Sequence, residues 1–236
     1  MALPFFYINN YDSNEQQVEL DEDTSRHVVQ VLRMKEGEQL HLTDGKGSLL
    51  VCEITEANKK YCAVGIKSQI QIPKSKRSVS IAISLLKNTN RFEWFLEKAT
   101  EIGVTEIIPL IADRTEKEKF RHDRLNGICI SAMLQSQQCW LPVLHEPVPF
   151  SDIQTWKMKD ATNFIAHCEE NEKQSLKDFS ISQLSNSQIL IGPEGDFTPA
   201  EIELALNNAF LPVALGETRL RTETAGVVAA TLLCIS

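Results

Sequence analysis

The chain has 236 residues, of which 42% are hydrophobic and 24% are charged. This is the composition of a globular protein with a sizeable core, and it excludes a disordered chain or a disulfide scaffold. The formal net charge of −8 argues against a protein that wraps nucleic acid along its whole surface. Residues 73–140, however, carry 11 basic and 8 acidic side chains, so this middle third is the part suited to face a polyanion.

The start of the chain has no basic segment and its apolar run stops at Asn9, so the sequence predicts no secretory signal. No stretch approaches the ~20 apolar residues that cross a bilayer. The 6 cysteines form no C-x-x-C pair, and the 5 histidines show no ligand spacing. We therefore expect a cytoplasmic protein with reduced thiols that acts without a metal and without a membrane.

Residues 1–72 are predicted to form a small, barrel-like β domain. Asp44-Gly45 is the strongest hairpin signal in this part. Barrels of this kind often bind RNA, although the fold alone does not prove that function. The expected elements are strands at Phe5–Asn9, around Leu40 and Leu42, at Leu49–Ile54 and at Tyr61–Ile66, and a short helix capped by Thr24 or Ser25 with Val28, Val31 and Leu32 on its apolar face.

Residues 73–236 show a different pattern, in which apolar strands alternate with amphipathic helices. Such alternation predicts an α/β domain with a largely parallel sheet. Asn90 is expected to cap the first helix, with Glu93 at the capping-box position and Gly103 at the C-terminal cap. The other predicted elements are strands at Val79–Leu86, Thr105–Ile111, Asn163–His167, Ile189–Ile191 and Val213–Leu215, and helices at Leu125–Ala132, after the capping box at Thr198, and at Thr222–Leu233.

Two loops of the last quarter each follow a predicted strand. The first loop, residues 192–197, begins Gly192-Pro193-Glu194-Gly195, and its glycines allow a ligand close to the backbone. Open α/β sheets bind ligands at the carboxyl ends of their strands, so this loop is a candidate ligand contact. The alternative is a tight turn with a capping acid.

The second loop, residues 215–221, holds Arg219 and Arg221, the only basic residues after Lys177. Two arginines in an otherwise acidic third indicate either an anion contact or a structural ion pair with Glu217 or Glu223. Signatures of P-loop nucleotide enzymes, dinucleotide dehydrogenases, serine hydrolases and zinc proteases are absent.

The first loop together with residues 215–225 resembles the SPOUT superfamily of S-adenosylmethionine-dependent RNA methyltransferases, and more narrowly the ribosomal RNA small subunit methyltransferase E family. Three departures from that family are Pro4 in place of a basic residue, Asp196 in place of a second glycine, and the absence of an arginine soon after Gln135-Ser136. The other segments that fit are His27-x-x-x-Val31-Leu32-Arg33, Lys87-x-x-x-Arg91 leading into Glu97–Val104, and Gln135-Ser136 followed by Leu141-Pro142.

The resemblance implies a PUA-like RNA-binding β-barrel domain in residues 1–72 and a trefoil-knotted α/β methyltransferase domain in residues 73–236, assembled as a homodimer. It implies transfer of a methyl group from S-adenosyl-L-methionine to N3 of one uridine in 16S rRNA of the small ribosomal subunit. The alternatives are a methyltransferase for another RNA or for the ribose 2′-OH, and a non-catalytic RNA-binding protein of the same fold.

Uracil N3 carries a weakly acidic proton, so the reaction needs a base or a cation that stabilises the anion. We expect Arg221 to stabilise the anion or to anchor a phosphate. Glu194 or Glu223 could orient that arginine, bind the cofactor or accept the proton, and the sequence does not choose between them. The residues that the resemblance assigns to the cofactor are Leu190, Ile191, Gly192, Pro193, Glu194, Gly195, Leu215, Gly216, Leu220, Thr222, Thr224 and Ala225.

Contact with rRNA phosphates is expected from basic residues of the middle third, with a solvated charged face as the alternative. Lys87 and Arg91 carry most weight because they lie at a strand–helix junction beside the expected site. The RNA candidates are Arg33, Lys46, Lys87, Arg91, Arg114 and Arg219, with Lys117, Lys119, Arg121 and Arg124 as further members of the basic segment.

Overall fold

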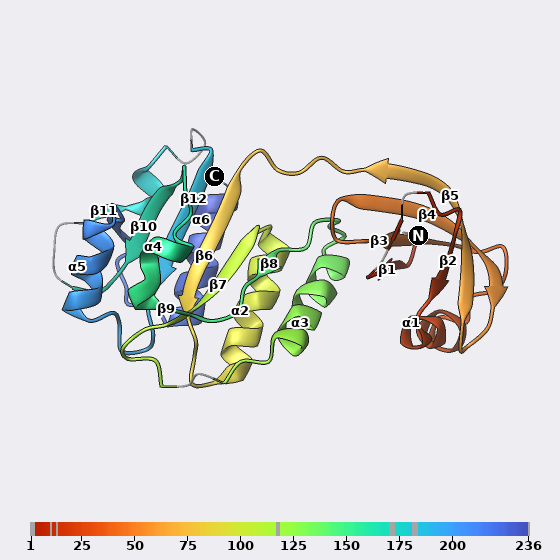
Figure 1. Ribbon diagram of the computed structural model, residues 1–236, viewed down its shortest axis with the longest axis horizontal. Helices are drawn as coiled ribbons and strands as arrows, with labels where there is room; N and C mark the ends of the chain where they lie inside the picture. The colour runs from red at the N-terminus through yellow and green to blue at the C-terminus, as the bar shows by residue number, and fades with distance from the viewer. Residues whose placement is uncertain are drawn as a thin grey trace. The chain divides into compact units, whose positions relative to one another are not determined.

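The computed structural model describes residues 3–9, 11–12, 14–116, 119–169, 173–180 and 184–235 (Figure 1). The chain packs into two units. The N-terminal unit consists of Met1–Lys74 and Met133–Leu141, and the C-terminal unit consists of Ser75–Ala132 and Pro142–Ser236. Among the described residues, no helix combines the length and apolar content needed to cross a membrane.

The N-terminal unit is built on a five-stranded sheet in the order β1-β3-β4-β5-β2. All pairs are antiparallel except β1 with β3. The hairpin predicted at Asp44-Gly45 is confirmed: it joins β3 to β4, and the Asp44 carboxylate accepts hydrogen bonds from the Lys46 and Ser48 amides. The elements are β1 (Phe5–Tyr7), β2 (Gln17–Leu20), α1 (Glu22–Arg26), the π-helix η1 (His27–Val31), β3 (Gln39–Thr43), β4 (Ser48–Ala57) and β5 (Cys62–Gln71).

The short helix after β2 differs from the prediction at both ends. Asp21, and not Thr24 or Ser25, caps it, because the Asp21 carboxylate accepts the Thr24 amide. The expected apolar face is also wrong: Val28 is buried, but Val31 and Leu32 are 64% and 42% exposed. The physical reason is the π-helical turn at His27–Val31, which has a wider repeat than the α-helical spacing assumed for that face.

The segment 133–141 packs within the N-terminal unit although it comes after the first helices of the other unit. The Cys139 carbonyl accepts a hydrogen bond from the Gly47 amide. The Trp140 indole donates to the Ile72 carbonyl, and Lys46 and Trp140 form an isolated β-bridge. The hairpin turn is therefore held by a segment distant in sequence.

The C-terminal unit contains an eight-stranded sheet in the order β11-β13-β10-β12-β6-β7-β8, with β9 also paired to β7. Every strand pair is parallel, as predicted. The strands are β6 (Ser78–Ser84), β7 (Glu106–Ile111), β8 (Val143–Leu144), β9 (Val148–Pro149), β10 (Thr162–Ala166), β11 (Gln174–Ser175), β12 (Asn186–Ile191) and β13 (Leu211–Ala214). The helices are α2 (Thr89–Ile102), α3 (His122–Gln135), η2 (Phe150–Asp152), α4 (Ile153–Trp156), η3 (Leu176–Asp178), α5 (Pro199–Asn207) and α6 (Thr222–Ile235).

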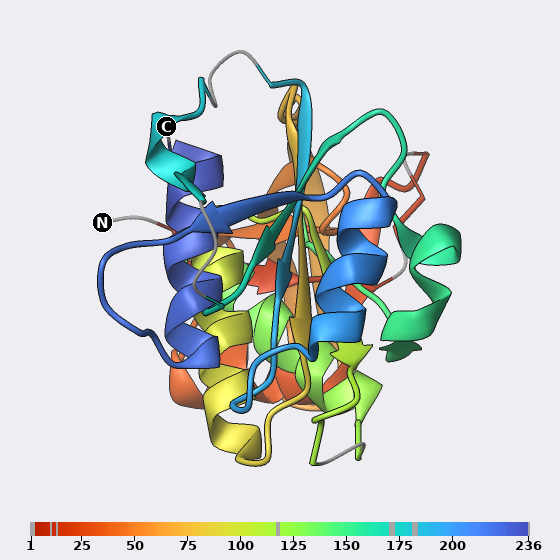
Figure 2. The ribbon, with the colours of Figure 1, turned by 90° about the vertical axis from the view of Figure 1, so that its left-hand side faces the viewer.

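Helices cover both faces of this sheet. Helices α2 and α6 lie together on one face, and α4 and α5 lie on the other (Figure 2). The α2–α6 contact is so close that a Cβ atom built at Gly226 would lie 2.6 Å from a ring carbon of Phe95. Phe150, Phe197 and Phe210 pack into the core on the α4–α5 side.

Helix caps in the C-terminal unit confirm one prediction and correct another. Thr198 and Glu201 form the predicted capping box of α5, with Pro199 as its first residue. Helix α2 is capped by Asn88 rather than Asn90, and Gly103 ends it with φ 100° as expected. Glu93 makes no capping box, because its carboxylate binds the Arg124 guanidinium of α3 at 3.0 and 3.1 Å.

Candidate functional site

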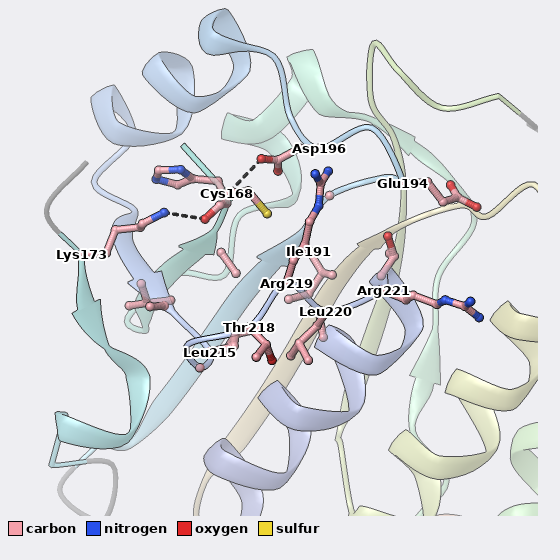
Figure 3. A pocket seen from close by; sticks show the side chains of 18 of the residues that line it. Cys168, Lys173, Ile191, Glu194, Asp196, Leu215, Thr218, Arg219, Leu220 and Arg221 are labelled. Carbon is pink, nitrogen blue, oxygen red and sulfur yellow. Dashed lines mark hydrogen bonds between the residues drawn. The ribbon is translucent and has the colours of Figure 1, made fainter. Parts of the chain in front are cut away.

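The carboxyl ends of β10, β12 and β13 surround a pocket of about 710 Å³ in the C-terminal unit (Figure 3). Because neighbouring parallel strands end at the same edge of a sheet, three separate chain segments meet there. One segment follows β10, one is the first loop after β12, and the third is the second loop between β13 and α6. The volume lies in the range of small-molecule and cofactor sites.

The first loop is held by hydrogen bonds on both of its sides. The Asp196 carboxylate accepts from the Cys168 amide at 2.7 Å, and the Asp196 amide donates to the Pro193 carbonyl. Arg114 donates to the Gly195 carbonyl at 2.6 Å. Asp196 has φ 63°, in the left-handed region, which aspartate tolerates better than most residues. This loop forms a fixed wall of the pocket.

Gly192 shows why the first loop needs a glycine where it leaves the strand. A Cβ atom there would lie 3.1 Å from a ring carbon of Phe197 and 3.2 Å from its backbone nitrogen. Phe197 is buried in the core of the unit, so it has little room to give way. The glycine thus permits the chain to turn directly over the end of β12.

The second loop is held very differently. Among the described residues, no side-chain hydrogen bond or ion pair joins Gly216–Leu220 to the rest of the protein; the loop connects to α6, where the Ala225 amide donates to the Arg221 carbonyl. Arg219 and Arg221 both line the pocket, and the Arg221 side chain extends away from Lys173 and Cys168 (Figure 3). Neither arginine forms one of the ion pairs expected with Glu217 or Glu223 in the part of the chain that the structure describes.

The segment after β10 supplies pocket residues that the motif analysis missed: His167, Cys168 and Lys173. The His167 side chain is buried, and its Nδ1 atom has no hydrogen-bond partner in the structure. Burial and the nearby Lys173 charge lower the pKa of His167, which favours the neutral ring. Lys173 donates to the His167 and Glu169 carbonyls. One signal in the sequence could have pointed to these residues. Asn163–His167 was predicted as a strand, and the two strands that pair with it in parallel lead into the first and second loops.

Most of the predicted cofactor residues line this pocket, and three do not. Leu190 is buried in the core of the unit, and Gly195 faces Arg114. Thr224 lies at a neighbouring hollow at the start of α6, which Glu223, predicted as a catalytic carboxylate, also lines. The predicted residues that do line the pocket are Ile191, Gly192, Pro193, Glu194, Leu215, Gly216, Arg219, Leu220, Arg221, Thr222 and Ala225.

Two smaller hollows share residues with the pocket. One, of about 510 Å³, is lined by Lys87, Asn88, Thr89, Arg91 and Glu194. Lys87 also pairs with Glu116 at 2.6 Å. We call it the positive hollow because the α2 N-terminus, Lys87 and Arg91 supply positive charge there, although the Glu194 carboxylate also lines it and Glu116 pairs with Lys87.

The other hollow, of about 330 Å³, is lined by residues of the first turns of α2 and α6. Within it, Arg91 approaches Glu223, with 3.6 Å between Nε and Oε1. The Glu223 side chain is only 8% exposed, and its Oε2 atom has no partner. The lining residues are Asn90, Arg91, Trp94, Arg221, Glu223 and Thr224.

The other basic candidates lie apart from the pocket or touch it at one point. Arg114 reaches the first loop, as described. Lys119 and Arg121 share a further hollow with Arg124, while Lys117 lies outside the described residues. In the N-terminal unit, Arg33 is exposed with φ 57°, and Lys46 is at the hairpin turn. Among the described residues, no group of three or more His, Cys, Asp or Glu side chains is arranged to hold a metal ion.

An α/β unit with a cofactor-sized pocket at its strand ends, in a chain that also contains a small β unit, matches a known class of RNA-modifying enzyme. Residues 73–234 match the model of the RNA methyltransferase domain, and residues 20–67 match that of the RNA methyltransferase PUA domain. The chain belongs to this RNA methyltransferase family, and within it to the ribosomal RNA small subunit methyltransferase E family. The predicted family and its PUA domain are therefore confirmed.

Individual relatives resemble the chain over nearly its full length. Ribosomal RNA small subunit methyltransferase E of Rickettsia conorii is 31% identical over 94% of this chain and 91% of the relative. The crystal structure of a probable rRNA-methyltransferase from Porphyromonas gingivalis is 40% identical, with TM-score 0.90 and 99% of both chains covered. Ribosomal RNA small subunit methyltransferase E from Neisseria gonorrhoeae, solved bound to S-adenosyl methionine, is 29% identical, with TM-score 0.86, covering 97% of this chain and 95% of that one.

Proposed function

We propose that this protein transfers a methyl group from S-adenosyl-L-methionine to N3 of one uridine in 16S rRNA of the small ribosomal subunit. The observation that carries the proposal is the pocket of about 710 Å³ at the ends of β10, β12 and β13. Its two loops hold the motifs that point to the methyltransferase family, and a relative of the same fold was solved with S-adenosyl methionine bound.

The residues of the pocket fit such a cofactor. Ile191, Leu215 and Leu220 give an apolar lining for the adenine and the methionine chain. The carboxylates of Glu194 and Asp196 suit the ribose hydroxyls and the ammonium group. The unpartnered Nδ1 of His167 is a buried polar atom that a bound ligand would satisfy.

The bound cofactor supplies a methyl group already activated on a sulfonium, so the protein contributes positioning and charge stabilisation. Arg221 lines both the pocket and the hollow at α6. From there, its guanidinium can stabilise the negative charge that uracil acquires when N3 loses its proton. Glu194 lines the pocket at its border with the positive hollow, whereas Glu223 is buried beside Arg91. We therefore assign Glu223 to orienting an arginine and leave Glu194 as the carboxylate facing the cofactor.

We also propose the domain roles, the assembly and the RNA contacts that the sequence predicts. Residues 1–72 act as the RNA-binding domain and residues 73–236 as the knotted catalytic domain of a cytoplasmic homodimer. Lys87 and Arg91 contact rRNA phosphates at the positive hollow. The remaining RNA contacts of the proposal are Arg33, Lys46, Arg114 and Arg219.

The decisive experiment maps methylated nucleosides on 16S rRNA from a strain that lacks the gene. We expect N3-methyluridine to disappear from one position and to return with the wild-type gene. An unchanged N3-methyluridine level would refute the proposal, and the loss of a ribose 2′-O-methyl group would favour the first alternative.

Calorimetry with S-adenosyl-L-methionine tests the other alternative. We expect saturable binding that His167→Ala weakens. No binding at millimolar cofactor would favour a non-catalytic RNA-binding protein of the same fold.

A further inference from the structure

The hollow between the first turns of α2 and α6 is not explained by cofactor binding. Its lining combines an aromatic ring, two guanidinium groups and a carboxylate: Trp94, Arg91, Arg221 and Glu223. Trp94 is 42% exposed, although large aromatic side chains gain most by burial. Building on the proposed function, we propose that this hollow receives the target base, with Trp94 as its stacking platform and Arg91 and Arg221 as the donors that select uracil.

The hollow adjoins both the pocket and the positive hollow, because it shares lining residues with each. Arg221 lines both this hollow and the pocket, so a base seated here adjoins the proposed methyl donor. Arg91 lines both this hollow and the positive hollow, so the two adjoin, and Lys87 of the positive hollow is the basic neighbour for the phosphate of the same nucleotide. A volume of about 330 Å³ accommodates a pyrimidine that has left its stack.

The side chains match the chemistry of uracil. Asn90, Arg91 and Trp94 are one, three or four residues apart on α2, which places them on neighbouring rows of that helix. Base stacking on an exposed indole contributes about 1–3 kcal/mol. Uracil flanks N3 with two carbonyl oxygens, O2 and O4, and each can accept from one arginine. Cytosine presents an amino group in place of O4, which would leave one arginine donor facing another donor.

The buried carboxylate of Glu223 independently points to a ligand in this hollow. Glu223 is more than nine-tenths buried and lines the hollow, yet its Oε2 has no hydrogen-bond partner. Oε1 lies 3.6 Å from the Arg91 Nε, which is beyond an ordinary hydrogen bond. A guanidinium can donate to both oxygens of one carboxylate and still keep N–H groups for a third acceptor, so Glu223 can hold Arg91 while Arg91 faces the base. Glu223 is thus a positioning residue that acts through Arg91.

The electrostatics favour the reacting form of the base. The N-terminal ends of α2 and α6 both face the hollow, and each carries a partial positive charge. The lining has two arginines against the single carboxylate of Glu223, so its net positive charge, together with the helix ends, stabilises the negative charge that spreads over O2 and O4 when N3 is deprotonated. The hollow therefore binds the uracil anion better than neutral uracil.

Fluorine NMR of protein labelled with 5-fluorotryptophan tests the site without relying on catalysis. The chain has 3 tryptophans, so each signal is assigned by a Trp→Phe variant. We expect uridine 5′-monophosphate to shift the Trp94 signal, with half-saturation about 10-fold lower than for cytidine 5′-monophosphate, a difference of about 1.4 kcal/mol. The signal of Trp156, whose indole binds the Pro149 carbonyl, is the internal control and should not move.

Variants separate recognition from folding. Arg91→Gln should remove the preference for the uridine nucleotide, and Glu223→Gln should weaken that preference while S-adenosyl-L-methionine still binds. Trp94→Ala should raise the KM for small ribosomal subunits more than it lowers kcat, and Trp94→Phe should restore most of the loss. Unaltered melting temperatures confirm that these variants fold.

Two results would overturn the inference while leaving the proposed function standing: a Trp94 signal that no nucleotide moves in a protein that methylates rRNA, or equal affinity for the two nucleotides. A Trp94 shift specific for the uridine nucleotide, in a protein without methyltransferase activity, would support the base site and refute the proposed reaction.

Discussion

The two loops that form the pocket face the same cavity but are held in opposite ways. The first loop is fixed at several points, by the Asp196 bonds to neighbouring backbone, by Arg114 and by the Thr198 cap that follows. The second loop is anchored mainly where it enters α6, and its residues Gly216–Arg219 are exposed. One wall of the pocket is therefore rigid before a ligand arrives, and the other is free to adjust.

This difference suits a reaction with two ligands. A rigid wall loses little conformational entropy when the cofactor binds, which favours affinity. The adjustable wall carries Arg219 and Arg221, the groups that face the nucleic acid in our proposal. Ordering that wall only when both ligands are present couples their binding. The following substitutions and pH changes test whether the first loop is a rigid wall for the cofactor and the second loop an adjustable wall that faces the RNA.

Arg221→Ala should have the largest effect, and on activity alone. The side chain is exposed and forms none of the ion pairs among the described residues, so the melting temperature should stay the same. Loss of a donor that stabilises developing charge typically lowers kcat about 10²–10³-fold. Steady-state kinetics with small ribosomal subunits measures this. Lys177→Ala is the matched control, because it removes another exposed cation of the same acidic third; full activity of Arg221→Ala would remove this residue from the site.

Gly226→Ala should disturb α6, the helix in which the second loop is mainly anchored. The new methyl group would lie 2.6 Å from Phe95 and 3.0 Å from Ile83, so α6 must move away from α2. Overpacking of this kind lowers the free energy of unfolding by about 1–3 kcal/mol, which urea denaturation measures. Gly127→Ala in α3 is the control: its Cβ would meet nothing within 4 Å, so stability should be unchanged or up to about 1 kcal/mol higher. Equal effects of the two substitutions would contradict the close α2–α6 contact.

Asp196→Ala should loosen the rigid wall. It removes the acceptor of the Cys168 amide and the link from the first loop to the segment after β10. We expect a loss of about 1–2 kcal/mol of stability and weaker cofactor binding by calorimetry. Asp196→Asn keeps one carbonyl acceptor and should lose less. If Asp196→Ala binds S-adenosyl-L-methionine as tightly as the wild type, the first loop is not preorganised by this bond.

The smallest effect should come from His167 as the pH falls. Burial, with help from the Lys173 charge, lowers the pKa of His167 below its ordinary value of 6.5, so the unfolded chain takes up this proton more readily than the folded one. The stability that this neutral ring contributes is complete above pH 6.5 and decreases as the pH falls through the lowered pKa. Melting temperatures from pH 7.5 to 5 should therefore fall less steeply for His167→Asn than for the wild type. Parallel curves of melting temperature against pH would show that protonation of His167 does not affect stability.

Much of the site was predictable because its signals are local. The capping box at Thr198, the hairpin at Asp44-Gly45 and the strand before each loop depend on residues within a few positions of one another. The alternation of apolar strands and helices likewise indicated the parallel sheet. For the same reason, the first and second loops could be recognised as ligand contacts.

Longer-range contacts decided the rest. Glu93 has the capping-box spacing, but Arg124, 31 residues away, binds its carboxylate, and Asn88 caps the helix instead. Val31 and Leu32 have the spacing of a buried face, but the π-helical turn exposes them. In each case, a tertiary contact or an irregular turn outweighed a local preference of about 1 kcal/mol or less.

The sequence by itself determined which segments become strands and helices, and which two loops carry the ligand-binding motifs. Only the tertiary structure decided which strands are neighbours, since β6 pairs with β12 across 108 residues. That strand order brings His167 and Lys173 to the pocket and sets Arg91 beside Glu223. Strand pairing depends on burial summed over the whole sheet, and no short window of sequence contains that sum.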